Sequence, residues 1–509
     1  MSNATLLSAG LLGIEAYPIH VEVDITKGLP GWSTVGLPES AVRESKERVI
    51  SSIHNCGYEF PFRRITLNLA PAGVKKQGTG FDLPIAVGLL TASEKLPKTR
   101  LGDYLLLGEL SLQGQLRPVR GALSVARLAQ RQGLKGLILP LENASEAAMI
   151  GGLEVWGARD LPEVVEFLCG RIQLQAPSEL PPTPLSAVAA PDFSEVQGQA
   201  HAKRAMEVAA AGFHNLMMVG PPGTGKSLMA GCLPSILPPM SLEESLTTMQ
   251  IYSLVGQLQE PGRLMKQRPF RAPHHTISDA GLIGGGSFPR PGEVSLAHNG
   301  VLFLDEIPEF KRNALESLRQ PLESHQVILS RAQCQIMYPS RFLLVGAMNP
   351  CPCGQRGNPR STCLCPVGTV QRYQGRISGP LLDRFDLKVE VPALSYSDLQ
   401  KNSPEEASAT ILERVLAARE RQQSRFRGTA LLYNAQMRGR EIREFCRLDA
   451  EGEALLEAAV QKWALSARAY HRILKVTRTL ADLDGDENIS LAHLSEAIAY
   501  RTGQSKGQL

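Results

Sequence analysis

Apolar runs of strand length alternate with helical stretches over the first 175 residues. Strand-like runs are short and rich in branched apolar residues, and the stretches between them repeat apolar residues at helical spacing. The predicted strands are Ile19–Ile25, Arg64–Leu69, Tyr104–Leu107 and Gly136–Leu139, and the predicted helices are Glu39–Asn55, Leu83–Ala92, Gly121–Gln132 and Glu142–Ile150. This alternation predicts an α/β domain over residues 1–175.

Residues 176–191 interrupt the pattern with five prolines in sixteen residues, which is typical of a stiff linker. A second α/β stretch follows over 192–395. From 396 to 509 strand signals vanish, which predicts a helical domain whose last helix is capped by Ser490. The predicted helices there are Leu399–Ser424, Met437–Arg447, Ala450–Leu465, Ala467–Leu483 and Ser490–Arg501.

Composition narrows the class of protein. A chain of 509 residues suggests about three domains, and 43% hydrophobic residues suit a globular protein. The formal charge of +4 is too small to indicate nucleic-acid binding, so any such surface must be local. Because no apolar run reaches the roughly 18 residues of a membrane span and the N-terminus lacks a signal-peptide pattern, we expect a cytoplasmic protein with reduced cysteines.

A phosphate-binding loop stands between a short apolar strand, Leu216–Val219, and a helical run from Leu228. Its pattern is G-x-x-x-x-G-K-S in the strand–loop–helix context that this motif requires. Backbone N–H groups of such a loop surround phosphate, the lysine reaches the β- and γ-phosphates, and the serine binds Mg²⁺. The predicted ATP ligands are Gly220, Pro221, Pro222, Gly223, Thr224, Gly225, Lys226 and Ser227.

Two later strands end in polar residues suited to hydrolysis. The run Gly300–Leu304 is followed by Asp305 and Glu306, which we expect to hold Mg²⁺ through water and to polarise the attacking water. A third strand, Arg341–Ala347, ends at Asn349, whose amide can orient that water. Phosphoryl transfer is mostly positioning and charge stabilisation, so these groups match its needs.

Two arginines are further candidates. Arg384, in Ser378–Asp386, could stabilise transition-state charge from a neighbouring subunit as an arginine finger. Arg468 begins a helix of the C-terminal region and could touch the phosphates from that side. Either side chain could instead form a surface salt bridge.

The order of these motifs over Asp192–Arg501 resembles the AAA+ ATPases. The chain resembles their magnesium-chelatase-like branch in the sequences of three segments, Pro269–His275, Gly292–Gly300 and Leu382–Phe385. The resemblance implies an AAA+ P-loop core, a C-terminal helical lid, an insert at about Gln250–Ser287 and a hairpin at Gln326–Gln335. In relatives both insert and hairpin project into the pore of a ring.

The N-terminal domain resembles the proteolytic domain of Lon at Gly108–Val119 and Gly133–Asn143. Lon needs a nucleophilic serine and a lysine base. The segment expected to carry the serine, Gln77–Asp82, has none, and the expected lysine position falls near Leu123. We therefore expect a Lon-like fold without protease chemistry. Thr79 is the remaining alternative nucleophile, with no evident base.

Four cysteines lie within fifteen residues as C-x-C-x₉-C-x-C, namely Cys351, Cys353, Cys363 and Cys365. Four thiolates suit tetrahedral Zn²⁺, so we expect a structural zinc site. A reduced loop without metal, a disulfide or an iron–sulfur site stay open, because this spacing is less diagnostic than paired C-x-x-C.

Two segments could contact DNA. Arg414–Arg443 holds eight arginines and two acids, a local charge of +6, although a solvated face with internal contacts explains it equally well. Arg263–His275 adds four basic residues and the pair His274 and His275, which favours a polar pore loop over a metal site. Neither segment indicates sequence-specific binding.

A Lon-like domain ahead of a chelatase-like AAA+ module resembles the ComM/YifB family over almost the whole chain. That resemblance implies a hexameric, ATP-driven DNA motor that promotes branch migration when incoming DNA is integrated during natural transformation. Two other classes stay open: a magnesium-chelatase motor subunit acting on a porphyrin, and an ATP-dependent protease or unfoldase.

Overall fold

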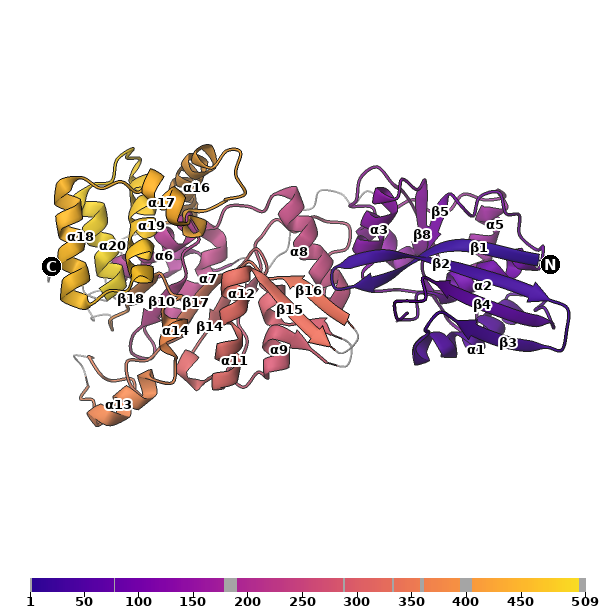
Figure 1. Cartoon of the computed structure of the whole chain (residues 1–509), viewed down its shortest axis with the longest axis horizontal. Helices are drawn as coiled ribbons and strands as arrows, with labels where there is room; N and C mark the ends of the chain where they lie inside the picture. Colours follow the sequence, from indigo (N-terminus) through magenta and orange to yellow (C-terminus); the bar gives the residue numbers. More distant parts are fainter. Residues whose placement is uncertain are drawn as a thin grey trace. The chain divides into compact units, whose positions relative to one another are not determined.

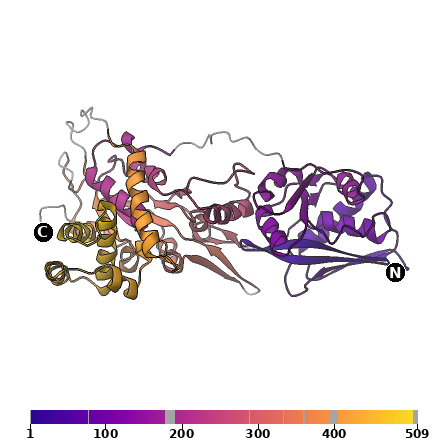
Figure 2. The same cartoon turned by 90° about the horizontal axis from the view of Figure 1, so that it is seen from above.

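The computed structural model describes residues 2–76, 78–177, 190–286, 289–331, 334–357, 361–393 and 405–502. The chain divides into two compact units (Figures 1 and 2). Unit 1 comprises Met1–Leu185 with Ser245–Met265, and unit 2 comprises Ser186–Glu244 with Lys266–Leu509. Most of the predicted linker and the boundary predicted at 395–396 lie outside the described residues, so those domain limits stay predictions.

Unit 1 is built on a seven-stranded mixed sheet. Its order is β3-β4-β2-β1-β5-β8-β9, with β1 antiparallel to β2, β2 antiparallel to β4, and the other pairs parallel. The strands are β1 (Ser2–Leu12), β2 (Glu15–Thr26), β3 (Gly31–Val35), β4 (Arg64–Ala70), β5 (Tyr104–Leu106), β8 (Gly136–Pro140) and β9 (Glu154–Ala158). A small antiparallel pair, β6 (Glu109–Leu110) and β7 (Leu116–Arg117), stands apart from it.

Both faces of this sheet are buried, as the alternation along its central strands shows. Leu106 and Ile138 belong to one hydrophobic cluster, whereas Leu105 and Leu137 belong to another. Successive side chains of a strand point to opposite faces, so the clusters lie on opposite sides. Helices α1 (Ser40–Asn55), α2 (Asp82–Ala92) and α5 (Leu161–Leu168) contribute to the first cluster, and α3 (Ala122–Arg131) and α4 (Leu141–Ala147) contribute to the second.

Helix α8 (Leu242–Val255) completes the second cluster, although it follows the P-loop in sequence. Its residues from Ser245 onward belong to unit 1, where Met249 is 1% exposed among core residues of α3, α4 and the sheet. Gln250 Nε2 donates to Ser124 Oγ over 3.3 Å, and Ser253 Oγ donates to the buried Glu146. The first part of the expected pore insert is therefore a core helix of unit 1.

Unit 2 contains a five-stranded parallel sheet in the order β11-β14-β17-β10-β18. These strands are β11 (Phe270–Arg271), β14 (Val301–Leu304), β17 (Leu343–Met348), β10 (Leu216–Val219) and β18 (Leu387–Glu390), packed with α6 (Ala200–Gly212) and α7 (Lys226–Ile236). Parallel strands place their carboxyl ends at one edge. The P-loop, Asp305 and Asn349 all follow such ends.

Short helices and strands lie in the segments that connect the strands of this sheet. The hairpin of β15 (Gln326–Arg331) and β16 (Cys334–Pro339) confirms the one expected at Gln326–Gln335. The other elements are α9 (Asp279–Ile283), β12 (Gly284–Gly285), β13 (Arg290–Pro291), α10 (Glu293–Leu296), α11 (Arg312–Ser317), α12 (Arg319–Ser324), α13 (Val367–Gln374) and α14 (Gly379–Leu382), with 3₁₀ turns at Phe193–Glu195, Ile307–Glu309 and Asn434–Gln436.

The C-terminal region is helical, as predicted. It contains α16 (Ser408–Arg425), α17 (Gly439–Phe445), α18 (Ala450–Trp463), α19 (Ala467–Asp484) and α20 (Leu491–Thr502). Ser490 caps α20 by accepting a hydrogen bond from the His493 N–H. Apolar residues of α16 and α19 share one core cluster with β10 and β18. Among the described helices, none combines the length and the apolar character that crossing a membrane requires.

Candidate ATP site and cysteine cluster

The loop between β10 and α7 has the backbone shape of a phosphate cradle. Gly223 and Gly225 have φ angles of +75° and +83°, in the left-handed region that favours glycine. At Gly220 a Cβ atom would lie 2.1 Å from the Val391 carbonyl oxygen, so no larger residue fits. The Thr224 hydroxyl donates to the Pro221 carbonyl over 3.0 Å and holds the turn. The loop leads into α7 at Lys226, where a helix N-terminus favours an anion.

Lys226 lies inside this loop and is 8% exposed. Its Nζ donates to the carbonyls of Gly220 and Pro221 over 2.8 and 2.7 Å, and to Asn349 Oδ1 over 3.4 Å. Burial lowers the pKa of Lys226, opposed by the charges of Asp305 and Glu306. Lys226 and Asn349, two predicted catalytic residues 123 positions apart, are thus in contact through the lysine ammonium group.

Ser227 and Asp305 provide the oxygen pair expected for Mg²⁺. The Ser227 hydroxyl donates to Asp305 Oδ2 over 2.6 Å, and the Glu306 N–H donates to Asp305 Oδ1 over 2.9 Å. Hard oxygen ligands suit Mg²⁺, which keeps several waters and binds through one or two protein groups plus phosphates. These residues therefore fit the ion.

Glu306 stands in a left-handed conformation, with φ of +48° directly after β14. A non-glycine residue in this region is uncommon and is strained unless its surroundings hold it. His275 Nδ1 lies 3.8 Å from Glu306 Oε2, and the His275 ring also meets Phe310 edge-on at 6.4 Å. Sequence reasoning interpreted the histidine pair as a polar pore loop and missed this contact. The signal that could have found it is the position of the pair just after β11, the strand beside β14.

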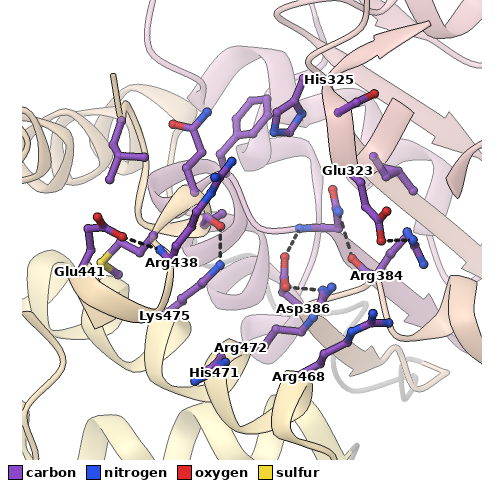
Figure 3. Close-up of a pocket in the computed structure, with 18 of the residues that line it drawn as sticks. Glu323, His325, Arg384, Asp386, Arg438, Glu441, Arg468, His471, Arg472 and Lys475 are labelled. Atoms are coloured by element: carbon purple, nitrogen blue, oxygen red, sulfur yellow. Dashed lines mark hydrogen bonds and ion pairs between the residues drawn. The ribbon is translucent and has the colours of Figure 1, made fainter. Parts of the chain in front are cut away.

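Arg384 and Arg468 line one cavity of about 930 Å³ in unit 2 (Figure 3). Arg384 Nη1 donates to the Pro380 carbonyl over 2.6 Å, and Arg384 Nη2 donates to Glu323. Arg472, also at this cavity, pairs with Asp386 over 2.5 Å. The lining contains no residue of the P-loop. Both predicted phosphate contacts therefore belong to a site separate from the chain's own phosphate cradle.

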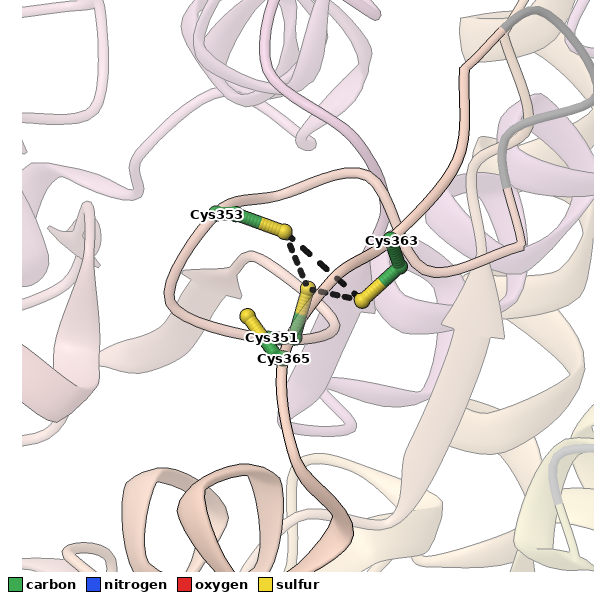
Figure 4. Close-up of side chains that lie close together, drawn as sticks. All are labelled: Cys351, Cys353, Cys363 and Cys365. Carbon is green, nitrogen blue, oxygen red and sulfur yellow. Dashed lines mark hydrogen bonds between the residues drawn. The ribbon is translucent and has the colours of Figure 1, made fainter.

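The four clustered cysteines converge, as Figure 4 shows. All four Sγ atoms lie within 4.8 Å of one another, and Cys351 Sγ lies 3.3 Å from Cys353 Sγ and 3.6 Å from Cys363 Sγ. A tetrahedral zinc with Zn–S of about 2.3 Å separates its sulfurs by about 3.8 Å. Hydrogen bonding, first from the Gln355 backbone, lowers the pKa of Cys353 to about 6. The donor set fits zinc.

This cysteine loop lies against the phosphate cradle. A Cβ atom at Gly354 would stand 2.6 Å from Pro222 Cδ and 3.9 Å from Asn349 Cγ. Gly354 has φ of +76° and donates its N–H to the Cys351 carbonyl over 2.9 Å. The loop thus forms part of the wall behind the P-loop.

Comparisons with known proteins agree with this geometry. Residues 192–399 match the family described as magnesium chelatase, subunit ChlI; residues 21–143 match subunit ChlI of Mg-chelatase; and residues 405–501 match its C-terminal part. The uncharacterized protein YifB of Escherichia coli K12 is 47% identical over 502 residues, covering 98% of this chain and 97% of that protein. The competence protein ComM of Haemophilus influenzae is 45% identical over 511 residues, covering 98% of both. The chain belongs to the ComM/YifB family.

The resemblance of this ComM/YifB protein to Lon covers part of the chain. The Lon protease of Trichlorobacter lovleyi is 24% identical over 171 residues, covering 31% of this chain and 21% of that protein. Gln77 lies outside the described residues, and Leu123 is fully buried. The Thr79 hydroxyl donates to Glu109, and Lys76 Nζ donates to the Pro71 carbonyl. No lysine–threonine pair is therefore formed in the described part of this region.

The segments predicted to touch DNA in this ComM/YifB protein are largely engaged in internal contacts. Arg414 pairs with Glu207 and Glu406, and Arg425 pairs with Asp482. Arg419 is buried with its guanidinium 3.9 Å from the Tyr433 ring centroid, and Arg421 donates to the Asp482 carbonyl. In the other segment, Arg268 pairs with Glu244 and Arg271 with Glu293. The exposed arginines of the first segment are Arg421, Arg427, Arg438, Arg440 and Arg443.

Proposed function

We propose that this ComM/YifB protein is an ATPase whose hydrolysis drives a hexameric DNA motor in branch migration during recombination. The observation that carries the ATPase part is the convergence of Lys226 with Asn349 and of Ser227 with Asp305 at the carboxyl ends of the parallel strands β14, β17 and β10. The DNA part is supported by whole-length similarity to a protein named for competence.

The residues take distinct roles in this proposal. Lys226 neutralises the β- and γ-phosphates from inside the loop, and Ser227 with Asp305 holds Mg²⁺, which supplies charge stabilisation when bound. Glu306 accepts a proton from the attacking water, and Asn349 orients that water. Positioning and charge stabilisation of this kind supply nearly all the catalysis in phosphoryl transfer.

Arg384 acts on a neighbouring subunit's nucleotide, and Arg468 contacts phosphate from the side of the C-terminal helices. The role of Arg384 in a neighbouring site is supported by the cavity that it lines, which contains no residue of its own P-loop. Such a contact joins unlike surfaces of two subunits, and it closes into a ring when the rotation allows. Nucleotide in the interface links ATP binding to ring assembly.

Zinc at Cys351, Cys353, Cys363 and Cys365 plays a structural part. It stiffens the loop that follows Asn349 and packs on Pro222. Exposed arginines such as Arg427 and Arg440 are the remaining candidates for sequence-independent DNA contacts in the first basic segment.

The two alternative functions are less favoured. The 45–47% identity to YifB and ComM extends over unit 1 as well as unit 2, whereas the 38 kDa subunit of the Cereibacter sphaeroides magnesium chelatase is 25% identical over 39% of this chain. A Lon-type protease would need a nucleophilic serine with a lysine base, and the segment Gln77–Asp82 contains no serine.

The decisive measurement is the ATPase rate with no DNA and with single-stranded, duplex and four-way-junction DNA. We expect the four-way junction to stimulate ATP hydrolysis most. With a branch-migration substrate, we also expect the protein to form strand-exchange products. If no DNA stimulates ATP hydrolysis and a porphyrin with Mg²⁺ does, the result would favour the chelatase hypothesis instead.

Two substitutions test the nucleotide chemistry. Glu306→Gln should keep ATP binding and lose hydrolysis, since an amide cannot take the proton. Lys226→Ala should lose binding, since its ammonium is a ground-state phosphate contact. Fluorescent-nucleotide titration and phosphate release separate the two effects, and hydrolysis at the native rate by Glu306→Gln would remove Glu306 from its role.

A further inference from the structure

The Arg384 guanidinium is buried and lies near other arginines. Its side chain is 8% exposed, and its Nε is buried without a hydrogen-bond partner among the described residues. Burial lowers the pKa of Arg384, and the nearby Arg319, Arg472 and Arg468 lower it further, whereas Glu323 raises it. A buried charge is costly unless it is paired. The side chain therefore depends on its counter-ion for its place.

Glu323 supplies that counter-ion. Among the ion pairs of the described residues, it is the one carboxylate bonded to Arg384, through Nη2 (Figure 3). The second terminal nitrogen is held by the Pro380 carbonyl over 2.6 Å. These two acceptors, one on each terminal nitrogen, fix the plane of the guanidinium. Charge-assisted bonds of this kind are the strongest orienting contacts of an arginine.

Glu323 also stands at the root of the β15–β16 hairpin. It belongs to α12, which ends at Ser324, and β15 begins at Gln326. Between them His325 adopts a left-handed conformation with φ of +56°, and its carbonyl accepts the Ser340 N–H over 2.9 Å, closing the base of the hairpin. Any displacement of the hairpin root therefore carries the Glu323 carboxylate with it.

The Glu323 side chain is 63% exposed, in contrast to its buried partner. Reorienting an exposed carboxylate costs little desolvation, whereas leaving the buried guanidinium unpaired costs much. The pair can therefore move as one unit when the hairpin root moves, while Arg384 keeps its counter-ion.

We propose that Glu323 is a positioning residue for Arg384, which sets the direction of the guanidinium and links it to the β15–β16 hairpin. The proposal rests on the proposed role of Arg384 at a neighbouring subunit's nucleotide. In a ring, the position of one subunit's hairpin then controls hydrolysis in the adjacent site.

The test uses full-length Glu323→Gln, Glu323→Asp, Arg384→Ala and the double variant Glu323→Gln/Arg384→Ala. Glu323→Gln should lower kcat for ATP about tenfold with KM unchanged, because the P-loop that binds ATP is untouched. Glu323→Asp should recover part of that loss, and DNA should no longer stimulate Glu323→Gln. In the Arg384→Ala background, Glu323→Gln should cause no further loss, since residues that act as one unit are not additive.

A matched control is Glu457→Gln, which removes an exposed carboxylate of α18 bonded to Gln461 and should keep native kcat and DNA stimulation. Thermal unfolding of each variant monitors folding, and the isosteric Gln keeps the test usable if Asp destabilises the chain. A native kcat in Glu323→Gln, or losses that add in the double variant, would overturn the proposal. Native activity of Arg384→Ala would instead remove Arg384 from the site and refute the function on which the proposal rests.

Discussion

At the scale of single residues, the contacts of Glu306 exceed what its motif predicts. The pattern of an apolar strand followed by two acids identifies the carboxylate. It does not predict the left-handed backbone of Glu306, nor the approach of His275 Nδ1, from the segment after β11, to within 3.8 Å of Glu306 Oε2. A side chain that limits the rotamers of a general base helps keep its geometry productive. His275 thus connects the segment after β11 to the carboxylate proposed to act in hydrolysis.

We predict that His275→Ala lowers kcat for ATP several-fold, about tenfold at most, with little change in KM, because Glu306 loses its neighbour while the P-loop stays intact. His275→Gln should recover part of the rate, since its amide can donate to the carboxylate. Steady-state phosphate release measures both.

The control for this change is His54→Ala, which removes an exposed imidazole at the end of α1 in unit 1. It should leave kcat unchanged. Native kcat in His275→Ala would show that the 3.8 Å approach has no catalytic consequence.

At the scale of elements, the cysteine loop and α8 each serve a region distant in sequence. The loop packs Gly354 on Pro222, and α8 places Met249 in the core of unit 1. Neither contact follows from the local pattern of the element. Each element therefore makes a contact that the order of the strands in the unit 2 sheet does not predict.

The cysteine loop should bind one Zn²⁺ per chain. Metal analysis of protein purified without chelator measures the stoichiometry, and Cys353→Ser should lose the metal and lower ATPase activity, because the wall behind the P-loop loosens. Cys169→Ser in unit 1 is the matched control and should keep both. Native protein without zinc and with four titratable thiols in this loop would contradict the assignment.

Met249→Ala should destabilise unit 1 by about 2–5 kcal/mol, because it leaves a cavity in the cluster under the sheet. Trp32 and Trp156 lie in unit 1, so urea unfolding followed by tryptophan fluorescence reports mainly on that unit. Leu242→Ala, at a 60% exposed position of the same helix, should change stability by less than about 0.5 kcal/mol. Equal effects of the two changes would show that α8 is not part of the core.

At the scale of the whole molecule, the proposed role of Arg384 requires a second copy of the chain. Arg384 lines a cavity without P-loop residues, and in the proposed ring it acts on the nucleotide of a neighbouring copy. Arginine fingers supplied in trans contribute on the order of 10³–10⁵ in rate in other NTPases. Assembly and hydrolysis are therefore expected to depend on each other.

Mixing two inactive variants tests this dependence. Arg384→Ala should bind nucleotide and hydrolyse poorly, and Glu306→Gln should behave likewise. Mixed rings should regain part of the ATPase activity, because some interfaces pair an intact Glu306 with an intact Arg384. Mass photometry verifies that ATP or a non-hydrolysable analogue forms rings and that they are mixed. Verified mixed rings without any recovery would exclude a trans role for Arg384.

Features that depend on local spacing could be predicted from the sequence. Apolar periodicity and caps predicted the C-terminal helices, with α19 starting at Ala467 as expected and α16 starting later than expected, at Ser408. The P-loop, the Asp305–Glu306 pair and the cysteine quartet are patterns of residue type, and parallel strands bring their ends together whatever the loops between them contain.

Tertiary structure alone decided which distant groups meet. Strand β1 contains small and polar residues and escaped prediction, yet pairing with β2 and β5 fixes it at the centre of the unit 1 sheet. The arginine-rich segment is only partly exposed, because Glu207 and Glu406 pair with Arg414 and Asp482 pairs with Arg425. Burial and charge pairing depend on residues far apart in the chain, so local spacing carries no signal for α8 in the unit 1 core or for Glu323 beside Arg384. The approach of His275 to Glu306 can be inferred only once β11 is placed beside β14.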